Sequence, residues 1–226
     1  MRDLWINGEH VSAYGLRVLH LPPITRPKAR INEINVPGRS GYLTRWRGDY
    51  DAIDLQVVLH YAGADPRAAL DWLGNARTVR FGHSPEWLYD CHRKDDLAGQ
   101  RVIADWHRIV LNLTCQPERR LVSEPVETGN PVTVTNTGTE PARPRIMLEP
   151  TATTVVLTVG TETWTLQGLS GWTTLDGLAG IVTDADGSAW SKLDRPDLPV
   201  IEPGETVSIS ATGVSQLSVM VQARWV

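Results

Sequence analysis

Residues 53–61 carry the most regular pattern in the first half of the chain and read Ile53-Asp54-Leu55-Gln56-Val57-Val58-Leu59-His60-Tyr61. The odd-numbered residues are all apolar, whereas those between them are mostly polar. This period of two is typical of a β-strand with one buried face. The segment therefore predicts a strand whose odd-numbered side chains form part of a core.

The segment that follows changes to a helical pattern. Residues 65–74 read Asp65-Pro66-Arg67-Ala68-Ala69-Leu70-Asp71-Trp72-Leu73-Gly74. An Asp cap, a Pro at the first helical position and a Gly at the end are typical signals of a short helix. We expect Ala69, Leu70, Trp72 and Leu73 to form the face that packs on the sheet.

Further strands are predicted on both sides of these two elements. The turn Asn7-Gly8 favours a two-residue hairpin between residues 4–6 and Val11, because both turn residues tolerate positive φ angles. The other predicted strands are residues 16–21, 79–81, 87–89, 102–104 and 109–115, the last ending at Gln116-Pro117. The first half is thus expected to be a mainly β domain, a sheet or barrel with one packed α-helix.

A domain boundary is predicted near Ser123-Glu124-Pro125, where the composition changes. Residues 1–125 hold 17 Lys and Arg against 15 Asp and Glu, whereas residues 126–226 hold 5 against 11 and include 17 threonines. The predicted strands after the boundary are residues 132–135, 145–148, 155–159, 163–166, 181–183, 207–211 and 217–226. Short strands separated by turn residues indicate an antiparallel β-sandwich. We therefore expect two domains, residues 1–125 and 126–226.

Composition and motifs argue against several classes of protein. No apolar run has the roughly 18 residues of a membrane-spanning helix, and the start lacks a signal-peptide core, so we expect a soluble chain. Cys91 and Cys115 are too few for a disulfide framework and are expected to be buried free thiols. No histidine pair has metal-ligand spacing, and no phosphate-loop, dinucleotide or nucleophile-elbow motif occurs. We expect no catalytic residue, metal or cofactor, and interpret Asp184-Ala185-Asp186-Gly187 as a hairpin turn.

Residues 26–47 are strongly basic. They contain six basic residues and one acidic residue, Glu33, and the basic ones are Arg26, Lys28, Arg30, Arg39, Arg45 and Arg47. Lys28, Arg30 and Asn32 are spaced by two, so a strand here would project them from one face. Such a face suits an acidic partner or nucleic acid, and it is also what a solvated sheet face looks like.

The order of several motifs resembles that of the siphophage distal tail protein family. Pro37-Gly38-Arg39-Ser40-Gly41 is similar to the Pro-Gly-Arg-Asp-Gly element of that family, with Ser40 where an Asp is usual. The helix at residues 65–74 and the Cys-x-Pro element Cys115-Gln116-Pro117 follow in the same order. The second half adds an Asn-x-Gly turn, Asn136-Thr137-Gly138, and the element Leu198-Pro199-Val200-Ile201-Glu202-Pro203-Gly204-Glu205. The resemblance covers nearly the whole chain.

This resemblance implies a structural protein of the virion without enzymatic activity. The family forms a hexameric ring, or baseplate hub, at the distal end of the tail tube, assembled in the host cytoplasm. The ring joins the tail tube protein to tail-tip proteins, and DNA passes through its central channel without specific binding. The N-terminal domain would be a split barrel that builds the ring, and the C-terminal domain a peripheral galectin-like sandwich that can hold receptor-binding proteins. Lys28, Arg30, Arg39, Arg45 and Arg47 are then candidates for the subunit interface or the channel wall.

Two other functions are compatible with the residues. A carbohydrate-binding β-sandwich protein that recognises the host surface would use exposed tryptophans, and Trp164, Trp172 and Trp190 are the candidates, although core packing is the alternative for each. A tail-associated hydrolase would need paired carboxylates in a cleft, and the sequence assigns no such pair.

Overall fold

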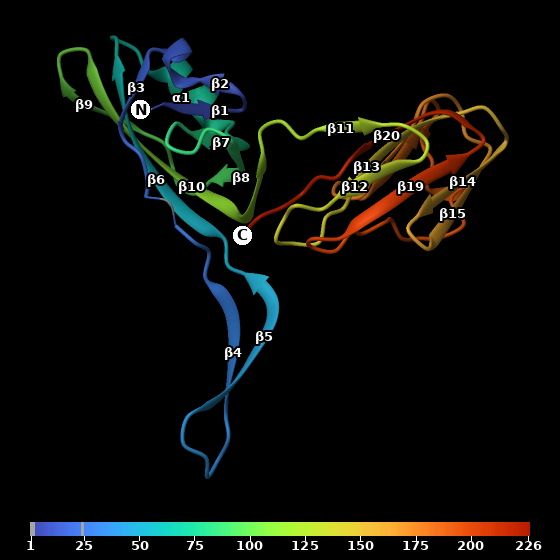
Figure 1. Cartoon of the computed structure of the whole chain (residues 1–226). Coiled ribbons are helices and arrows are strands. Elements are labelled where there is room, and N and C mark those ends of the chain that lie inside the picture. Colours follow the sequence, from blue (N-terminus) through green and yellow to red (C-terminus); the bar gives the residue numbers. More distant parts are fainter. Residues whose placement is uncertain (1–2, 24) are drawn as a thin grey trace. The chain divides into compact units, whose positions relative to one another are not determined.

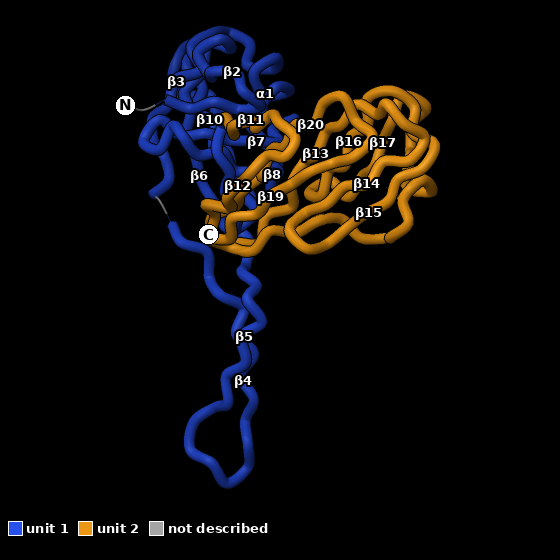
Figure 2. Tube along the Cα trace, turned by 45° about the vertical axis from the view of Figure 1, so that its right-hand side comes forward, with its two compact units in different colours: residues 1–122, 226 blue, residues 123–225 orange. Residues whose placement is uncertain are grey.

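The computed structural model describes residues 3–23 and 25–226. The chain forms two compact units, one from Met1 to Val122 together with Val226, and one from Ser123 to Trp225 (Figure 2). Both units are built mainly from β-strands. This confirms the mainly β class expected from the sequence.

The first unit is built on a curled antiparallel sheet of eight strands (Figure 1). Its order is β2 (Glu9–His10), β1 (Leu4–Ile6), β7 (Thr78–Phe81), β8 (Trp87–Arg93), β10 (Trp106–Leu121), β6 (Ile53–Ala62) and β3 (Leu16–His20), and β9 (Gly99–Ile103) pairs with β10. β6 is the strand predicted from residues 53–61, and its odd-numbered residues from Ile53 to Leu59 are buried. Asn7 and Gly8, in the turn between β1 and β2, have φ angles of 53° and 86°. The alternation and the turn signal are therefore confirmed.

The helix α1 (Arg67–Gly74) packs on this sheet through Ala69 and Leu73, which are buried, and through Leu70 and Trp72, which are partly buried. The predicted start is wrong by one residue. Pro66 is the N-cap and not the first helical residue. The Asp65 carboxylate still accepts a hydrogen bond from the Arg67 backbone N–H at 3.1 Å, so the acidic residue satisfies one free donor of the first turn.

The predicted end of β10 at Gln116-Pro117 is also wrong. The strand continues to Leu121, with an irregularity in its pairing to β8 between Cys115 and Arg119. Pro lacks the N–H that a regular ladder needs, and a bulge is where a strand can contain it. The proline therefore interrupts the register of the strand without ending it.

Residues between β3 and β6 form a separate hairpin of β4 (Ala29–Asn35) and β5 (Tyr42–Tyr50). Among the described strands these two pair only with each other (Figure 1). Nearly every residue of both strands is exposed. We call residues 29–50 the arm.

The second unit contains two antiparallel sheets that share one core. The first sheet has the order β11 (Val126–Thr128), β20 (Val214–Met220), β13 (Arg145–Pro150), β16 (Thr173–Asp176), β17 (Ile181–Asp184) and β18 (Gly187–Ser188). The second has the order β12 (Val132–Thr135), β19 (Thr206–Thr212), β14 (Thr154–Val159) and β15 (Glu162–Gln167). Both sheets contribute buried residues to the same core, which is the arrangement of a sandwich.

The predicted end of the last strand of this unit is wrong. β20 ends at Met220, and Gln222 has a φ of 57°, so the alternation predicted through Trp225 stops there. The short strands β11, β16 and β18 were not predicted. The hairpin turn predicted at residues 184–187 is confirmed, because Asp184 pairs with Gly187 across it.

The Asn-x-Gly turn after β12 has a structural role that the side-chain contacts explain. Asn136 is fully buried, and its amide donates to the carbonyl oxygens of Glu140 and Ile201, each at 2.9 Å. Its side-chain oxygen accepts a hydrogen bond from the Gly138 N–H at 2.9 Å. A Cβ at Gly138 would lie 2.4 Å from the Arg224 carbonyl oxygen, so only glycine fits. The Asn136 side chain therefore closes its own turn and joins it to the segment at Ile201.

We expect Asn136→Ala to lower the free energy of unfolding of the second unit by about 2–4 kcal/mol, because it removes three hydrogen bonds and leaves buried polar atoms unpaired. Urea denaturation of the full chain measures the loss. The exposed Gln216 supplies the control, and Gln216→Ala should change the free energy of unfolding by less than about 0.5 kcal/mol. Equal stability of the two variants would contradict this role of Asn136.

Candidate interaction surfaces

The arm exposes an unusual amount of apolar surface for a strand pair. Its exposed apolar residues and their exposed fractions are Ile31 (53%), Ile34 (45%), Tyr42 (61%), Leu43 (42%) and Trp46 (54%). An isolated two-stranded hairpin is marginally stable in water, since it has no third strand or helix on which to pack. A surface of this kind is typical of a segment that another molecule covers.

Apolar residues lie on both faces of the arm. Ile31 is paired with Trp46, and Ile34 with Leu43, in the antiparallel register. Residues an odd number of positions apart along a strand point to opposite sides, so these two pairs lie on opposite faces. A cover on one face alone would leave the other pair in water.

Several basic residues lie in the arm or directly before it. Lys28 directly precedes β4, and Arg30 and Asn32 are alternate residues of that strand. The pairing irregularity adds residues to β5, where Trp46 and Tyr50 lie opposite Ile31 and Ala29. Arg30 donates to the Asp51 carboxylate at 2.7 Å and is therefore neutralised locally.

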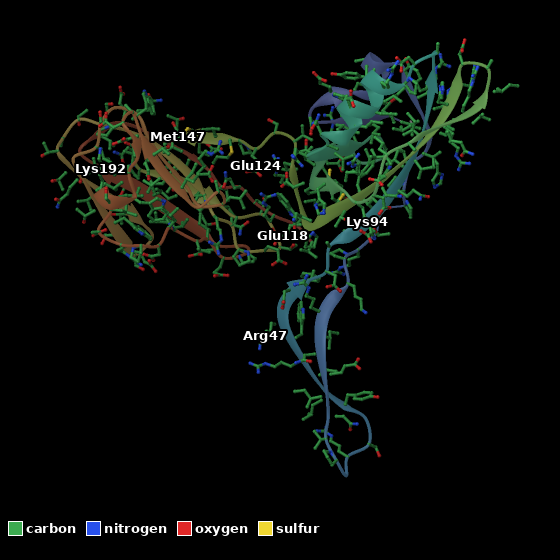
Figure 3. The ribbon with its side chains drawn as sticks, turned by 180° about the vertical axis from the view of Figure 1, so that it is seen from behind. Arg47, Lys94, Glu118, Glu124, Met147 and Lys192 are labelled. Atoms are coloured by element: carbon green, nitrogen blue, oxygen red, sulfur yellow. The ribbon has the colours of Figure 1, made fainter. Side chains whose placement is uncertain are left out.

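Three arginines of the arm are exposed. Arg45 lies opposite Asn32 in the ladder, and Arg39 lies in the turn between the two strands. The Arg47 side chain extends away from the ribbon (Figure 3). The arm therefore combines apolar pairs with positive charge. This combination suits a partner surface that is also apolar and carries negative charge.

A second exposed apolar surface lies on the eight-stranded sheet, and the sequence analysis missed it. A groove of about 580 Å³ is lined by Leu19, His20, Gln56, Val58, His60, Val102, Ile103, Trp106 and Arg108. These residues come from β3, β6, β9 and β10. Val102 and Ile103 are 64% and 70% exposed. We call this surface the groove.

A buried imidazole lies in the wall of the groove. The His60 side chain is 6% exposed, and its Nε2 atom has no hydrogen-bond partner among the described residues. Its ring lies against that of Trp106, with 4.0 Å between the ring centroids. Burial lowers the pKa of His60, and electrostatic interactions with Arg17 and His107 lower it further. The imidazole is therefore held in its neutral form, which suits an apolar environment.

This shift gives a prediction for pH. The pKa of His60 is lower in the folded chain than its ordinary value of 6.5, which applies to the unfolded chain. Above pH 6.5 the side chain is neutral in both states, so the stability is then at its full value. As the pH falls below that value the unfolded chain binds the proton first, so stability is lost. We expect thermal unfolding between pH 7.5 and 5.5 to show a smaller acid-induced decrease in Tm for His60→Gln than for the wild-type chain. An identical decrease would show that His60 does not contribute to it.

The three candidate tryptophans have different environments. Trp164 is 2% exposed, lies in the core of the second unit and donates from Nε1 to the Asp197 carbonyl oxygen at 3.0 Å. Trp190 is partly buried against the same core. The prediction of Trp164 as a ligand contact is therefore wrong, and its alternative, core packing, is what the structure shows. An indole in a packed sandwich core is not accessible to a ligand. Trp172, 49% exposed, is the candidate with a free ring surface.

The two cysteines are buried and free, as expected, and they are direct partners across β8 and β10. A hydrogen bond with Cys91 and burial both raise the pKa of Cys115, so its thiolate form is disfavoured. Among residues 3–23 and 25–226, no cluster of three or more His, Cys, Asp or Glu side chains could hold a metal ion. No helix in the same ranges is long and apolar enough to cross a membrane.

The fold has a counterpart among solved structures. The chain superposes on the crystal structure of the SPP1 protein Dit (gp 19.1) with a TM-score of 0.71, over 100% of both chains and at 15% sequence identity. The two chains share a fold. Dit is described as a paradigm of the hub adsorption apparatus in phages that infect Gram-positive bacteria. No protein-family model and no curated protein matches the sequence.

Proposed function

We propose that this protein is a structural component of a phage tail. It forms a hexameric ring at the distal end of the tail tube, joins the tube to the tail tip or host-binding apparatus, and encloses a channel for DNA. The fold shared with the hub protein Dit supports this function, as do the motifs that resemble the distal tail protein family.

The observation that carries the proposal is the arm. It exposes apolar residues on both faces and has no cover among the described residues of its own chain. A chain that repeats one head-to-tail contact closes into a ring, and such a contact needs two different patches on each copy. The arm and the adjoining Lys28 supply one of the patches. The residues that contact a neighbour or face the channel are Lys28, Arg30, Arg39, Arg45 and Arg47.

The other parts of the proposal follow from the ring. The tail tube protein binds one side of the ring and a tail-tip protein binds the other. The second unit is the peripheral part that holds receptor-binding proteins. No reaction or cofactor is part of this role, and the protein belongs to the virion at the tail tip.

The mass of the purified chain in solution tests the proposal. Multi-angle light scattering after size-exclusion chromatography should give about six times the mass of one chain, and negative-stain electron microscopy should show closed rings. A monomer at all concentrations up to those of an assembling tail would contradict the proposed function.

A second candidate function depends on Trp172. An exposed indole on a sandwich is a typical platform for a sugar ring, so carbohydrate binding by the second unit is the alternative.

A further inference from the structure

Cys91 and Cys115 lie directly opposite each other in the ladder of β8 and β10, two neighbouring strands of the first unit (Figure 1). They form the last regular pair of that ladder before the irregularity between Cys115 and Arg119. Both side chains belong to the core of the unit, and their exposed fractions are 8% for Cys91 and 0% for Cys115. The proposed ring makes no use of these two thiols.

The backbone hydrogen bonds show which kind of pair the two cysteines form. The Cys91 N–H donates to the Arg77 carbonyl oxygen at 2.7 Å, and therefore points to the β7 side of β8, away from β10. Three residues further along β8, the Lys94 N–H donates to the Asn112 carbonyl oxygen of β10 at 2.9 Å. Hydrogen-bonded and non-hydrogen-bonded pairs alternate along an antiparallel ladder. Both observations make the cysteines a non-hydrogen-bonded pair.

A pair of this kind has the geometry that a disulfide bond needs. Its Cα atoms are about 4.5 Å apart, and its side chains approach each other more closely than those of a hydrogen-bonded pair. Disulfide bonds usually join residues whose Cα atoms are about 4.4–6.8 Å apart. The two thiols are already in contact, because Cys115 forms a hydrogen bond with Cys91. The bond can therefore form without a change in the register of the strands.

We propose that Cys91 and Cys115 form a disulfide bond across β8 and β10 when the folded chain meets hydrogen peroxide. The bond closes a loop of residues 91–115, which contains β9 and the first part of β10. It fixes the ladder at the point where its regular pairing stops. Closing a loop restricts the unfolded chain, so the bond stabilises the first unit.

The reaction needs only the two thiols and the peroxide. The thiolate of Cys91, the more exposed of the two, attacks a peroxide oxygen and becomes a sulfenic acid, and the hydroxide that leaves takes the thiol proton to form water. The Cys115 sulfur then attacks the Cys91 sulfur. The S–S bond forms as the S–O bond breaks, and the second hydroxide takes the Cys115 proton. The thiols lose two electrons, which the peroxide gains as it becomes two molecules of water.

Burial makes this reaction slow and selective for a small oxidant, since it disfavours the thiolate and keeps larger molecules away. A cytoplasm keeps thiols reduced, whereas the surroundings of a released virus particle do not. A tail protein would therefore fold with free thiols and acquire the bond after release.

Peptide mapping tests whether the bond forms. The folded full chain is treated with hydrogen peroxide, the remaining thiols are alkylated in denaturant, and the chain is digested with trypsin. Because trypsin cleaves after arginine, the bond should join the peptides of residues 81–93 and 109–119. Mass spectrometry should detect the linked pair, and dithiothreitol should separate it.

Thermal unfolding tests what the bond does. Oxidation should raise the Tm of the first unit by about 5–10 °C, the shift expected for a closed loop of about 25 residues, and dithiothreitol should reverse the rise. Cys91→Ala is the matched control, because it keeps Cys115 and every methionine but cannot form the bond. Its Tm should not rise in peroxide, and Cys115→Ala should behave in the same way.

Two results would overturn the inference. One is a folded chain that keeps both thiols, or converts them only to sulfinic or sulfonic acids, after prolonged exposure to peroxide. The other is a linked peptide pair without a rise in Tm, which would remove the stabilising role. The bond lies within one copy, so a monomer and a hexamer should give the same result. Its failure therefore leaves the proposed ring intact, and the absence of a ring leaves the bond intact.

Discussion

Replacing Arg39, Arg45 and Arg47 together by glutamate is expected to convert the hexamer into monomers, a decrease of about sixfold in mass. The segment from residue 26 to residue 47 then changes from six basic residues and one acidic residue to three basic and four acidic residues. Like charges brought together at a subunit contact cost several kcal/mol, and the same cost recurs at each junction of the ring. Light scattering at physiological salt measures the mass.

The matched control keeps the charge and changes only the shape of the cation. Arg39→Lys, Arg45→Lys and Arg47→Lys should retain the hexamer if charge is what matters, and should weaken it if bidentate guanidinium contacts matter. All three arginines are exposed, so neither set of changes should affect the unfolding of the single chain. A glutamate variant that forms rings of normal mass would remove these arginines from the interface.

Much of the sheet structure could be predicted, because burial on one face leaves a period of two in the sequence. β6 is the clearest example, with buried Ile53, Leu55, Val57 and Leu59 on one side. The ends of the strands were harder to predict. A local signal such as a proline indicates a stop, whereas pairing with a neighbouring strand can carry the strand past it. Pro117 looked like a stop but lies within β10, where the partner β8 continues to pair beyond it. The last strand ends at Met220, shortly before Gln222 and its φ of 57°.

The candidate surfaces were predicted only in part, for a physical reason. The basic residues of residues 26–47 lie close together in the sequence, so their charge could be predicted from it, whereas the exposure of the apolar residues between them could not. Only the structure shows that Ile31 and Trp46 lack a core beneath them. The groove combines residues from β3, β6, β9 and β10, separated by up to about 90 positions in the chain, so no local pattern could reveal it.

Trp164→Ala is expected to lower the free energy of unfolding by about 3–5 kcal/mol, the usual cost of removing a large buried aromatic side chain. Trp164 lies opposite Leu157 in the ladder of β14 and β15, and the Arg195 guanidinium stacks on its ring at 4.6 Å from the centroid. The variant loses these contacts and the hydrogen bond to Asp197. Urea denaturation monitored by circular dichroism measures the loss, and a stable variant would contradict the core position of this indole.

Trp172→Ala distinguishes the structural function from the alternative of carbohydrate recognition. Its ring is half-exposed, so the change should alter the free energy of unfolding by less than about 0.5 kcal/mol, in contrast to Trp164→Ala. If the chain acts as a ring component, the variant forms hexamers and its binding on a glycan array equals that of the wild-type chain. If the chain is a lectin, the wild-type protein is a monomer that binds glycans, and Trp172→Ala abolishes binding while the fold persists. The comparison is decisive because one variant of unchanged stability gives opposite results for the two functions: a loss of binding can then come only from a sugar that stacked on the indole, since neither unfolding nor a broken ring could account for it.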